Sequence, residues 1–432
     1  MRCYFARGVV RYFIAALPLL LCVTGFAEER TGTTLPLNER VYLASRLYAS
    51  LKYFAQAQNL RGTDIDATYR SYLDKALASE DRFAFTRASM QFFAALHNGH
   101  TLFMDMTLIQ QGGTLPFTAE YLAGKWVVTA SRVEGLKPGD VIETIDNQTF
   151  EEFYAGRRSL ISASTEQWAR RAIFSRLGGL SPYAHLVPDK FTLGLAGGRK
   201  VSVDRTAQST ASMETIGRWL EAGKTAYIRI PSFLSPEHQK RAIELLHEFK
   251  GAAFLIVDVR GNSGGSTPDE LTSQLMDRPY RWWTEATPML LPYFHFRASE
   301  GKWQYQPFDT SEMTWRNPGS QPAKENFKGK LALLVDGGCN SACEDFTMPF
   351  KDNGRALVVG TTTAGSSGQP YVLDLGNGMM ALVGAKREMF PDGSPFEGVG
   401  IKPDLEIAPT AEDLKQGKDI VLEAARKSIQ GS

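Results

Sequence analysis

Apolar residues recur at helical spacing in the first folded part of the chain. From residue 37 to about residue 103 they repeat at intervals close to 3.6, which predicts about three or four helices. The apolar positions of the first of these helices are Val41, Leu43, Leu47, Leu51 and Phe54. A later helix over residues 86–96 ends at Asn98-Gly99, a helix stop signal, and the turn that follows carries His100.

The hydrophobic pattern changes twice further along the chain. Between residues 116 and 205, short segments with glycine-containing turns predict a β-rich region. From about residue 214, strands alternate with helices, which is typical of an α/β structure with a largely parallel sheet. The strands are expected at residues 225–230, 253–259, 330–335 and 356–359, and the helices at 236–249 and 342–352.

An aromatic-rich insertion at residues 278–327 interrupts this alternation. Aromatic side chains at such density suit a lid that faces the substrate, but a long loop packed on the core explains them equally well. The aromatic residues are Trp282, Trp283, Tyr293, Phe294, Trp303, Tyr305 and Trp315.

The N-terminus has the layout of a secretory signal peptide. Three arginines precede an apolar run over residues 13–26, and Gly25 and Ala27 are the small residues typical of a cleavage point. Residues 1–27 are therefore predicted to be removed during export, to the periplasm or outside the cell, which leaves no membrane span. An uncleaved membrane anchor is the alternative.

Composition and charge favour a globular protein and exclude some partners. At 432 residues the chain is long enough for about two or three domains. Removal of residues 1–27 leaves 45 basic and 47 acidic side chains, with no basic run downstream. Binding to nucleic acid or to an anionic membrane is therefore not expected.

Cleavage would leave two cysteines, Cys339 and Cys343. Export permits a disulfide bond between them, although a separation of four residues is geometrically demanding. A pair of reduced, buried thiols remains the alternative.

Ser341 lies where a buried strand passes through a small-residue turn into a helix. At the start of a helix, unpaired backbone N–H groups and the positive end of the helix dipole stabilise the negative charge that develops during acyl transfer. This position suits a nucleophile. The alternative is that Ser341 only caps the helix.

Six short segments, taken together, resemble the tail-specific, or C-terminal-processing, serine peptidase family. Their order and spacing cover nearly the whole chain after residue 27. The segments are LHNGHT at residues 96–101, GLKPGDVI at 135–142, AYIRIPSF at 226–233, DVRGNSGG at 258–265, SACE at 341–344, and PDG at 391–393 with GIKPD at 400–404. The segment at 135–142 by itself resembles the turn and strand of PDZ domains.

The resemblance implies roles for individual residues. Ser341 occupies the nucleophile position of the family motif S-A-S-E. Ser366 stands where one branch of the family has a catalytic lysine, and Lys351 and Lys386 do not occupy that position. The chain therefore looks more like the tricorn core protease branch, which uses a histidine base and a supporting glutamate.

In that branch His100 matches the base and Glu397 matches the supporting glutamate, whereas Gly99 stands where the branch has a serine. An imidazole pKa near about 6.5 suits proton transfer at neutral pH. Ser366 is expected to have no part in proton transfer. Glu397 has a simpler alternative as a solvated turn residue.

An oxyanion hole is expected from two backbone N–H groups. Ala342 is placed by its position next to Ser341, and either Gly264 or Gly265 can approach closely because neither has a side chain. An ordinary strand exit also explains the two glycines.

The resulting prediction is an exported serine endopeptidase acting on protein or peptide substrates, with no cofactor. It has a helical N-terminal domain at 35–111, a PDZ-like domain at 112–210 that would present substrate C-termini, and a crotonase-like α/β domain at 214–432. No metal site is expected, since His97 and His100 lack a third ligand. Non-catalytic ligand-binding and scaffold proteins on the same fold are the alternatives.

Overall fold

The structure is a computed structural model, and it describes residues 34–55, 62–175, 181–205, 214–288, 312–316 and 319–431. The predicted signal peptide lies outside these ranges. So do most aromatic residues of the 278–327 insertion. Within the described ranges, no helix is long and apolar enough to cross a membrane.

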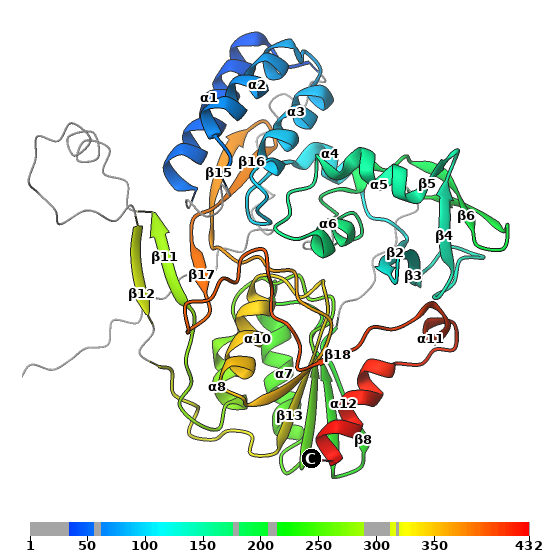
Figure 1. Ribbon diagram of the computed structural model, residues 1–432, viewed down its shortest axis with the longest axis vertical. Helices are drawn as coiled ribbons and strands as arrows, with labels where there is room; N and C mark the ends of the chain where they lie inside the picture. The colour runs from blue at the N-terminus through cyan, green and yellow to red at the C-terminus, as the bar shows by residue number, and fades with distance from the viewer. Residues whose placement is uncertain are drawn as a thin grey trace, which may run out of the picture.

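A six-stranded sheet, mostly parallel, forms the centre of the α/β region (Figure 1). Its order is β18-β14-β13-β10-β9-β8, and only the edge strand β8 is antiparallel to its neighbour. The strands are β8 Ile216–Glu221, β9 Thr225–Arg229, β10 Phe254–Asp258, β13 Lys330–Val335, β14 Ala356–Gly360 and β18 Leu405–Glu406. The predicted alternation and the largely parallel sheet are confirmed.

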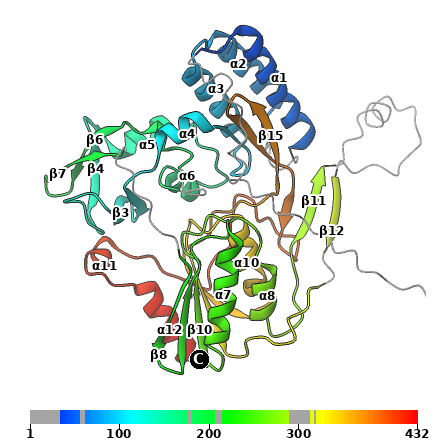
Figure 2. The same cartoon turned by 180° about the vertical axis from the view of Figure 1, so that it is seen from behind.

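Helices cover both faces of this sheet (Figures 1 and 2). Side chains alternate between faces along a strand, so that Leu255 and Val257 of β10 face one helical layer and Ile256 faces the other. The first layer contains α7 Pro236–Glu248, α8 Asp269–Leu275 and α10 Ala342–Asp352. The second is the C-terminal helix α12 Ile420–Gly431.

The N-terminal region is helical. It contains α1 Leu37–Phe54, α2 Ile65–Ala78, α3 Arg82–Ala94 and α4 Met106–Gly112. Asp64 and Asp81 cap α2 and α3 by accepting hydrogen bonds from backbone N–H groups of the first turn. Leu43, Leu47 and Leu51 are buried as predicted, but Val41 is 44% exposed and does not belong to the buried face of α1.

A hairpin from late in the chain packs on these N-terminal helices. Strands β15 Pro370–Gly376 and β16 Met379–Gly384 form a three-stranded sheet with β1 Leu102–Asp105, and Tyr371 stacks on Phe54 of α1 at 3.8 Å. The hairpin falls within the range 214–432 expected for the α/β domain. Its packing places the loop between β14 and β15 next to the turn that carries His100.

The middle region is an antiparallel sheet in the order β2-β3-β4-β6-β7. Helix α6 Glu166–Ala172 lies in the chain between α5 and β6. The other elements are β2 Phe117–Leu122, β3 Lys125–Ser131, β4 Val141–Ile145, β5 Gln148–Thr149, β6 Lys190–Leu195, β7 Lys200–Asp204, α5 Phe150–Arg158 and η3 Ala184–Leu186.

A small sheet completes the fold. It consists of β11 Thr284–Pro288, β12 Glu312–Arg316 and β17 Arg387–Met389. Trp283, at the start of β11, is fully buried and packs against Phe396 with ring centroids 4.6 Å apart. For this residue the packed-core explanation of the aromatic insertion holds. Helix α11 Ala411–Lys415 precedes α12.

Candidate active site

Ser341 lies directly before α10, at the end of the turn that follows β13. Its backbone has φ 56° and ψ −124°, unlike the extended conformation of an ordinary N-cap serine. Its N–H lies 3.1 Å from the Ser366 carbonyl oxygen and 3.2 Å from Glu344 Oε2. The turn therefore holds this serine in an uncommon conformation, at the positive end of the α10 dipole.

His100 is fixed at both its backbone and its side chain. Its N–H donates to Asn98 Oδ1 at 2.9 Å, and its Nδ1 lies 2.9 Å from Ser366 Oγ. The Ser366 hydroxyl donates in turn to Glu397 Oε1 at 3.1 Å. Because the Ser366 hydroxyl donates its proton to Glu397, it can only accept a hydrogen bond from His100 Nδ1–H. The unprotonated nitrogen of the imidazole is then Nε2, which is available to accept a proton.

Glu397 is the meeting point of several donors. Its Oε1 accepts from Asn98 Nδ2 at 2.8 Å, from Ser366 and from the Ser164 hydroxyl. Its Oε2 accepts from the Ser367 N–H at 3.3 Å. This carboxylate is therefore not a freely solvated turn residue.

Ser366, for which no part in proton transfer is expected, nevertheless lies within the site. Ser366 contacts both His100, through its hydroxyl, and Ser341, through its carbonyl oxygen. A Cβ added at Gly99 would lie 2.9 Å from Ser366 Oγ, so the hydroxyl fills the space beside Gly99. A side chain from position 366 thus reaches the place that a side chain at position 99 would occupy.

Glu344 connects the Ser341 turn to the loop that carries Ser366. Besides the Ser341 N–H, its buried carboxylate accepts from the Gly365 N–H at 2.7 Å, the Ser366 N–H at 3.1 Å and the Thr363 hydroxyl. Burial raises the pKa of this carboxyl group. The sequence contained Glu344 within its SACE segment, but no role had been predicted for it.

The two glycines at the end of β10 differ in their contacts. A Cβ added at Gly264 would lie 2.8 Å from Ser341 Cβ and 3.1 Å from the Ala342 nitrogen, so this glycine permits close approach to Ser341. The Gly264 N–H already donates to Asn262 Oδ1 at 2.9 Å. Among the described residues, the N–H groups of Ala342 and Gly265 have no acceptor.

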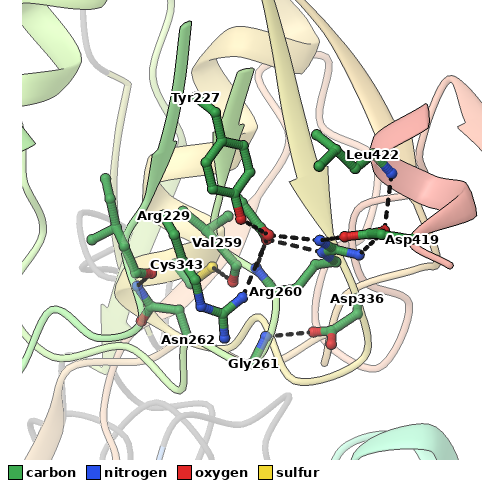
Figure 3. Close-up of polar contacts among 12 residues, drawn as sticks. Tyr227, Arg229, Val259, Arg260, Gly261, Asn262, Asp336, Cys343, Asp419 and Leu422 are labelled. Atoms are coloured by element: carbon green, nitrogen blue, oxygen red, sulfur yellow. Dashed lines mark hydrogen bonds and ion pairs between the residues drawn. The ribbon is translucent and has the colours of Figure 1, made fainter. Parts of the chain in front are cut away.

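Arg260 anchors the turn that carries these glycines (Figure 3). Its guanidinium forms paired hydrogen bonds with Asp258, at 2.9 and 2.6 Å, and with Asp419 at 2.9 and 2.7 Å. Asp419 precedes α12 and accepts from the Leu422 N–H. The C-terminal helix is therefore tied to the turn after β10.

The His100 imidazole is neutral at pH 7. Burial, together with the positive charge of Lys386, lowers its pKa to about 4. Lys386 is itself paired with Glu285 at 2.7 Å and with Glu388 at 2.5 Å, and these carboxylates raise its pKa despite burial. Lys386 is therefore a charged group near the site rather than a neutral base.

Cys339 and Cys343 are joined by a disulfide bond, and both are fully buried. Their Cα atoms are 5.2 Å apart on either side of Ser341. No cluster of three or more His, Cys, Asp or Glu side chains suited to a metal ion occurs within the part of the chain described.

Sequence reasoning missed Asn98, Ser164, Ser366 and Glu344 as members of this cluster. Asn98 and Glu344 lie inside segments that resembled the family, which was a usable signal. Ser164 comes from the middle region, and nothing in the sequence connects it with Glu397.

Residues 224–407 match peptidase family S41. The carboxyl-terminal-processing peptidase 2 of Arabidopsis thaliana is 28% identical over 272 residues, which is 62% of this chain. The aligned part is 46% of that relative, so the chain spans less than half its length.

Solved structures share the fold. Mature CPAF in complex with lactacystin has a TM-score of 0.68 at 16% identity, covering 92% of this chain and 99% of that one. The tricorn protease has a TM-score of 0.50 at 19% identity, covering 91% of this chain and 37% of that one. The α/β region of this chain, residues 224–407, is therefore similar to peptidase family S41, and the chain shares its fold with these solved structures.

Proposed function

We propose that the chain is a serine endopeptidase in which Ser341 is the nucleophile and His100 the general base, with Glu397 supporting His100 through Ser366. The observation that carries the proposal is the continuous hydrogen-bonded series Glu397–Ser366–His100, in which Ser366 also contacts Ser341. The match to peptidase family S41 supports the reaction class.

In the proposed reaction, Ser341 Oγ attacks the carbonyl carbon of a peptide bond and gives its proton to His100 Nε2. The tetrahedral oxyanion accepts hydrogen bonds from the N–H groups of Ala342 and Gly265, of which neither has another acceptor among the described residues. Collapse breaks the C–N bond, and the departing amine takes the proton from His100. Water then hydrolyses the acyl-enzyme by the same route.

Gly265 is preferred to Gly264 as the second oxyanion donor because the Gly264 N–H is engaged by Asn262. The role of Gly264 is instead steric, because it lets its turn lie close to Ser341. Any side chain at this position would collide with the backbone around Ser341. Gly264→Ala should therefore impair acylation for steric reasons.

The decisive test is covalent labelling with a fluorophosphonate probe. The wild-type protein should be labelled and should hydrolyse peptides, whereas Ser341→Ala should do neither. Ser45→Ala is the matched control, because Ser45 lies on the surface of α1 and bonds only the carbonyl of Val41. Labelling of Ser341→Ala, or an unlabelled and inactive wild-type protein, would overturn the proposal and favour a non-catalytic binding protein.

We further propose that the middle region, residues 112–210, presents the C-terminus of the substrate by strand addition, as its PDZ-like segment suggests. Peptides with a free C-terminal carboxylate should then be cleaved with a lower KM than the same peptides with a C-terminal amide. Equal KM values for the two series would exclude C-terminal recognition.

Export is the remaining part of the proposal, and it rests on the charge and apolar pattern of residues 1–27. Expression in a bacterial host followed by fractionation and intact-mass measurement would test it. A periplasmic protein that begins after Ala27 is expected, and a full-length protein in the cytoplasm would contradict it.

A further inference from the structure

A side chain of the middle region lies against both turns that form the proposed catalytic centre. Arg171 of α6 is close to the backbone at Gly338 and Gly261: a Cβ at Gly338 would be 2.3 Å from Arg171 Nε, and one at Gly261 would be 3.1 Å from Nη2. The guanidinium therefore occupies the space that a side chain at position 338 would need, and it lies close to the backbone at Gly261.

Arg171 bonds the carboxylate that joins these two turns. Its Nη1 lies 3.0 Å from Asp336 Oδ2 and also contacts Glu120 of β2. Asp336 Oδ1 accepts from the Gly261 N–H at 2.8 Å and from the Gly338 N–H at 2.9 Å, the first of which is drawn in Figure 3.

Each of the two turns leads to a different part of the site. The turn from Asp258 through Gly261 continues to Gly264 and Gly265, and the turn from Asp336 through Gly338 continues to Ser341. Asp336 is thus a single acceptor shared by the oxyanion turn and the nucleophile turn. Its position depends on Arg171, because no other cation bonds this carboxylate among the described residues.

The same segment of the middle region also contacts the loop that carries Ser366, the residue bonded to His100. Thr165 Oγ1 donates to the Ala364 carbonyl at 2.6 Å, and Gln167 Nε2 donates to the Thr363 carbonyl at 3.1 Å. Residues 164–171 therefore contact the nucleophile turn, the loop around Ser366 and, through Ser164, Glu397. The middle region is part of the walls of the catalytic centre.

We propose that Arg171 is a positioning residue for the reaction, which fixes the nucleophile turn and the oxyanion turn relative to each other by binding Asp336. The proposal rests on the proposed function. Nη1 of the guanidinium pairs with two half-buried carboxylates, Asp336 and Glu120, while its Nε and Nη2 lie against the backbone at Gly338 and Gly261. Without it, the half-buried Asp336 carboxylate keeps its two backbone N–H donors but has no cation to hold it, and the two turns can separate.

A comparison of Arg171→Gln with Arg170→Gln tests this. Arg170 is the next residue on α6, and it pairs with Glu151 and stacks on Tyr121, both within the middle region. Each variant loses two partly exposed ion pairs of the same helix, with Asp336 and Glu120 in one case and with Glu151 and Glu166 in the other. In Arg171→Gln the rate of fluorophosphonate labelling and kcat should both fall by about 100-fold, while KM stays nearly unchanged. Arg170→Gln should keep both within a few-fold of wild type.

Two further measurements keep the test independent of folding. Arg171→Ala leaves room for a guanidinium ion in place of the missing side chain. Its labelling rate should therefore rise in millimolar guanidinium chloride, whereas the labelling rate of a generally unstable protein would not rise. Thermal unfolding and circular dichroism of all variants identify any that do not fold. Wild-type labelling rates in a folded Arg171→Gln protein, or no guanidinium rescue of Arg171→Ala, would overturn the inference. An inactive wild-type enzyme would instead refute the proposed function.

Discussion

Ser366 Oγ lies 2.9 Å from His100 Nδ1, and its proton is donated to Glu397. A serine thus stands between the histidine and the carboxylate, where many serine hydrolases have a direct contact. The arrangement selects the Nδ1–H tautomer of His100, because the Ser366 hydroxyl can only accept from it. The roles of three residues can therefore be separated experimentally.

Ser366→Ala should slow acylation by about 100-fold or more, because His100 would lose the partner that fixes its tautomer and ring orientation. Stopped-flow measurement of acylation with an ester substrate checks this. Ser367→Ala is the matched control, since its hydroxyl has only a 3.4 Å contact with Asp345. Equal rates in the Ser366→Ala and wild-type enzymes would remove Ser366 from the series.

Glu397→Gln tests the charge separately from the geometry. The amide oxygen of glutamine can still accept from Asn98, Ser164 and Ser366, and only the contact with the Ser367 N–H is lost. We expect a fall in kcat of about 10-fold, because the imidazolium formed in the transition state loses a distant countercharge. The larger loss expected for Glu397→Ala would measure the positioning contribution. Equal kcat values for all three proteins would mean that Glu397 does not support His100.

The sequence predicted local structure in the α/β region closely. Helix α10 and strand β13 have the predicted bounds, because a continuous apolar run followed by small residues and a helical pattern defines both ends. The packing of the β15–β16 hairpin on the N-terminal helices, away from the central α/β sheet, was not predicted. Pairing of β16 with β1 joins residues nearly 300 positions apart, and no local pattern specifies that partner.

The site was predicted with uneven success for the same reason. Ser341 is marked by its place before a helix, whereas His100 and Glu397 came from the family resemblance alone. The contact of Ser366 with His100 was not predicted, because the alignment of Ser366 with a lysine position drew attention to the missing amine and not to the hydroxyl that is present. Arg171 was not identified, since its contact with Asp336 depends on how the middle region packs.

The bond between Cys339 and Cys343 should stabilise the enzyme in an oxidising compartment. Intact-mass measurement after alkylation without reductant should find no free thiol. The paired substitution Cys339→Ser and Cys343→Ser should lower the free energy of unfolding by about 2 kcal/mol, which is the entropy expected for so short a loop. Chemical denaturation measures this loss. Two alkylated thiols in active enzyme would show that the bond is not required.

The pH dependence of acylation tests the environment of His100. Only the neutral imidazole can accept the Ser341 proton, so kcat/KM should rise as the pH rises through the pKa of His100 and stay level above it. Burial and Lys386 lower that pKa to about 4, well below the value near about 6.5 expected for an exposed histidine.

The acid limb of the profile should therefore lie near pH 4, with little change between pH 6 and 8. The stability of the protein should also fall toward acidic pH. Below about pH 6.5 His100 is protonated in the unfolded chain but not in the folded protein, because its folded pKa is about 4. The free energy of unfolding should therefore fall as the pH drops from about 6.5 to about 4.

Lys386→Met provides the specific test of the cause. Removal of this cation leaves Glu285, Glu388 and Asp345 as the nearest charges, so the pKa of His100 and the acid limb should move to higher pH. Lys351→Met is the matched control, because Lys351 pairs with Asp404 at the partly exposed end of α10. The two profiles should be measured between about pH 3.5 and about pH 9, which spans the lowered and the ordinary pKa of histidine, with folding checked by circular dichroism. An acid limb near pH 6.5 in the wild-type enzyme, unmoved by Lys386→Met, would mean that His100 is solvated in the working enzyme and that Lys386 does not act on it.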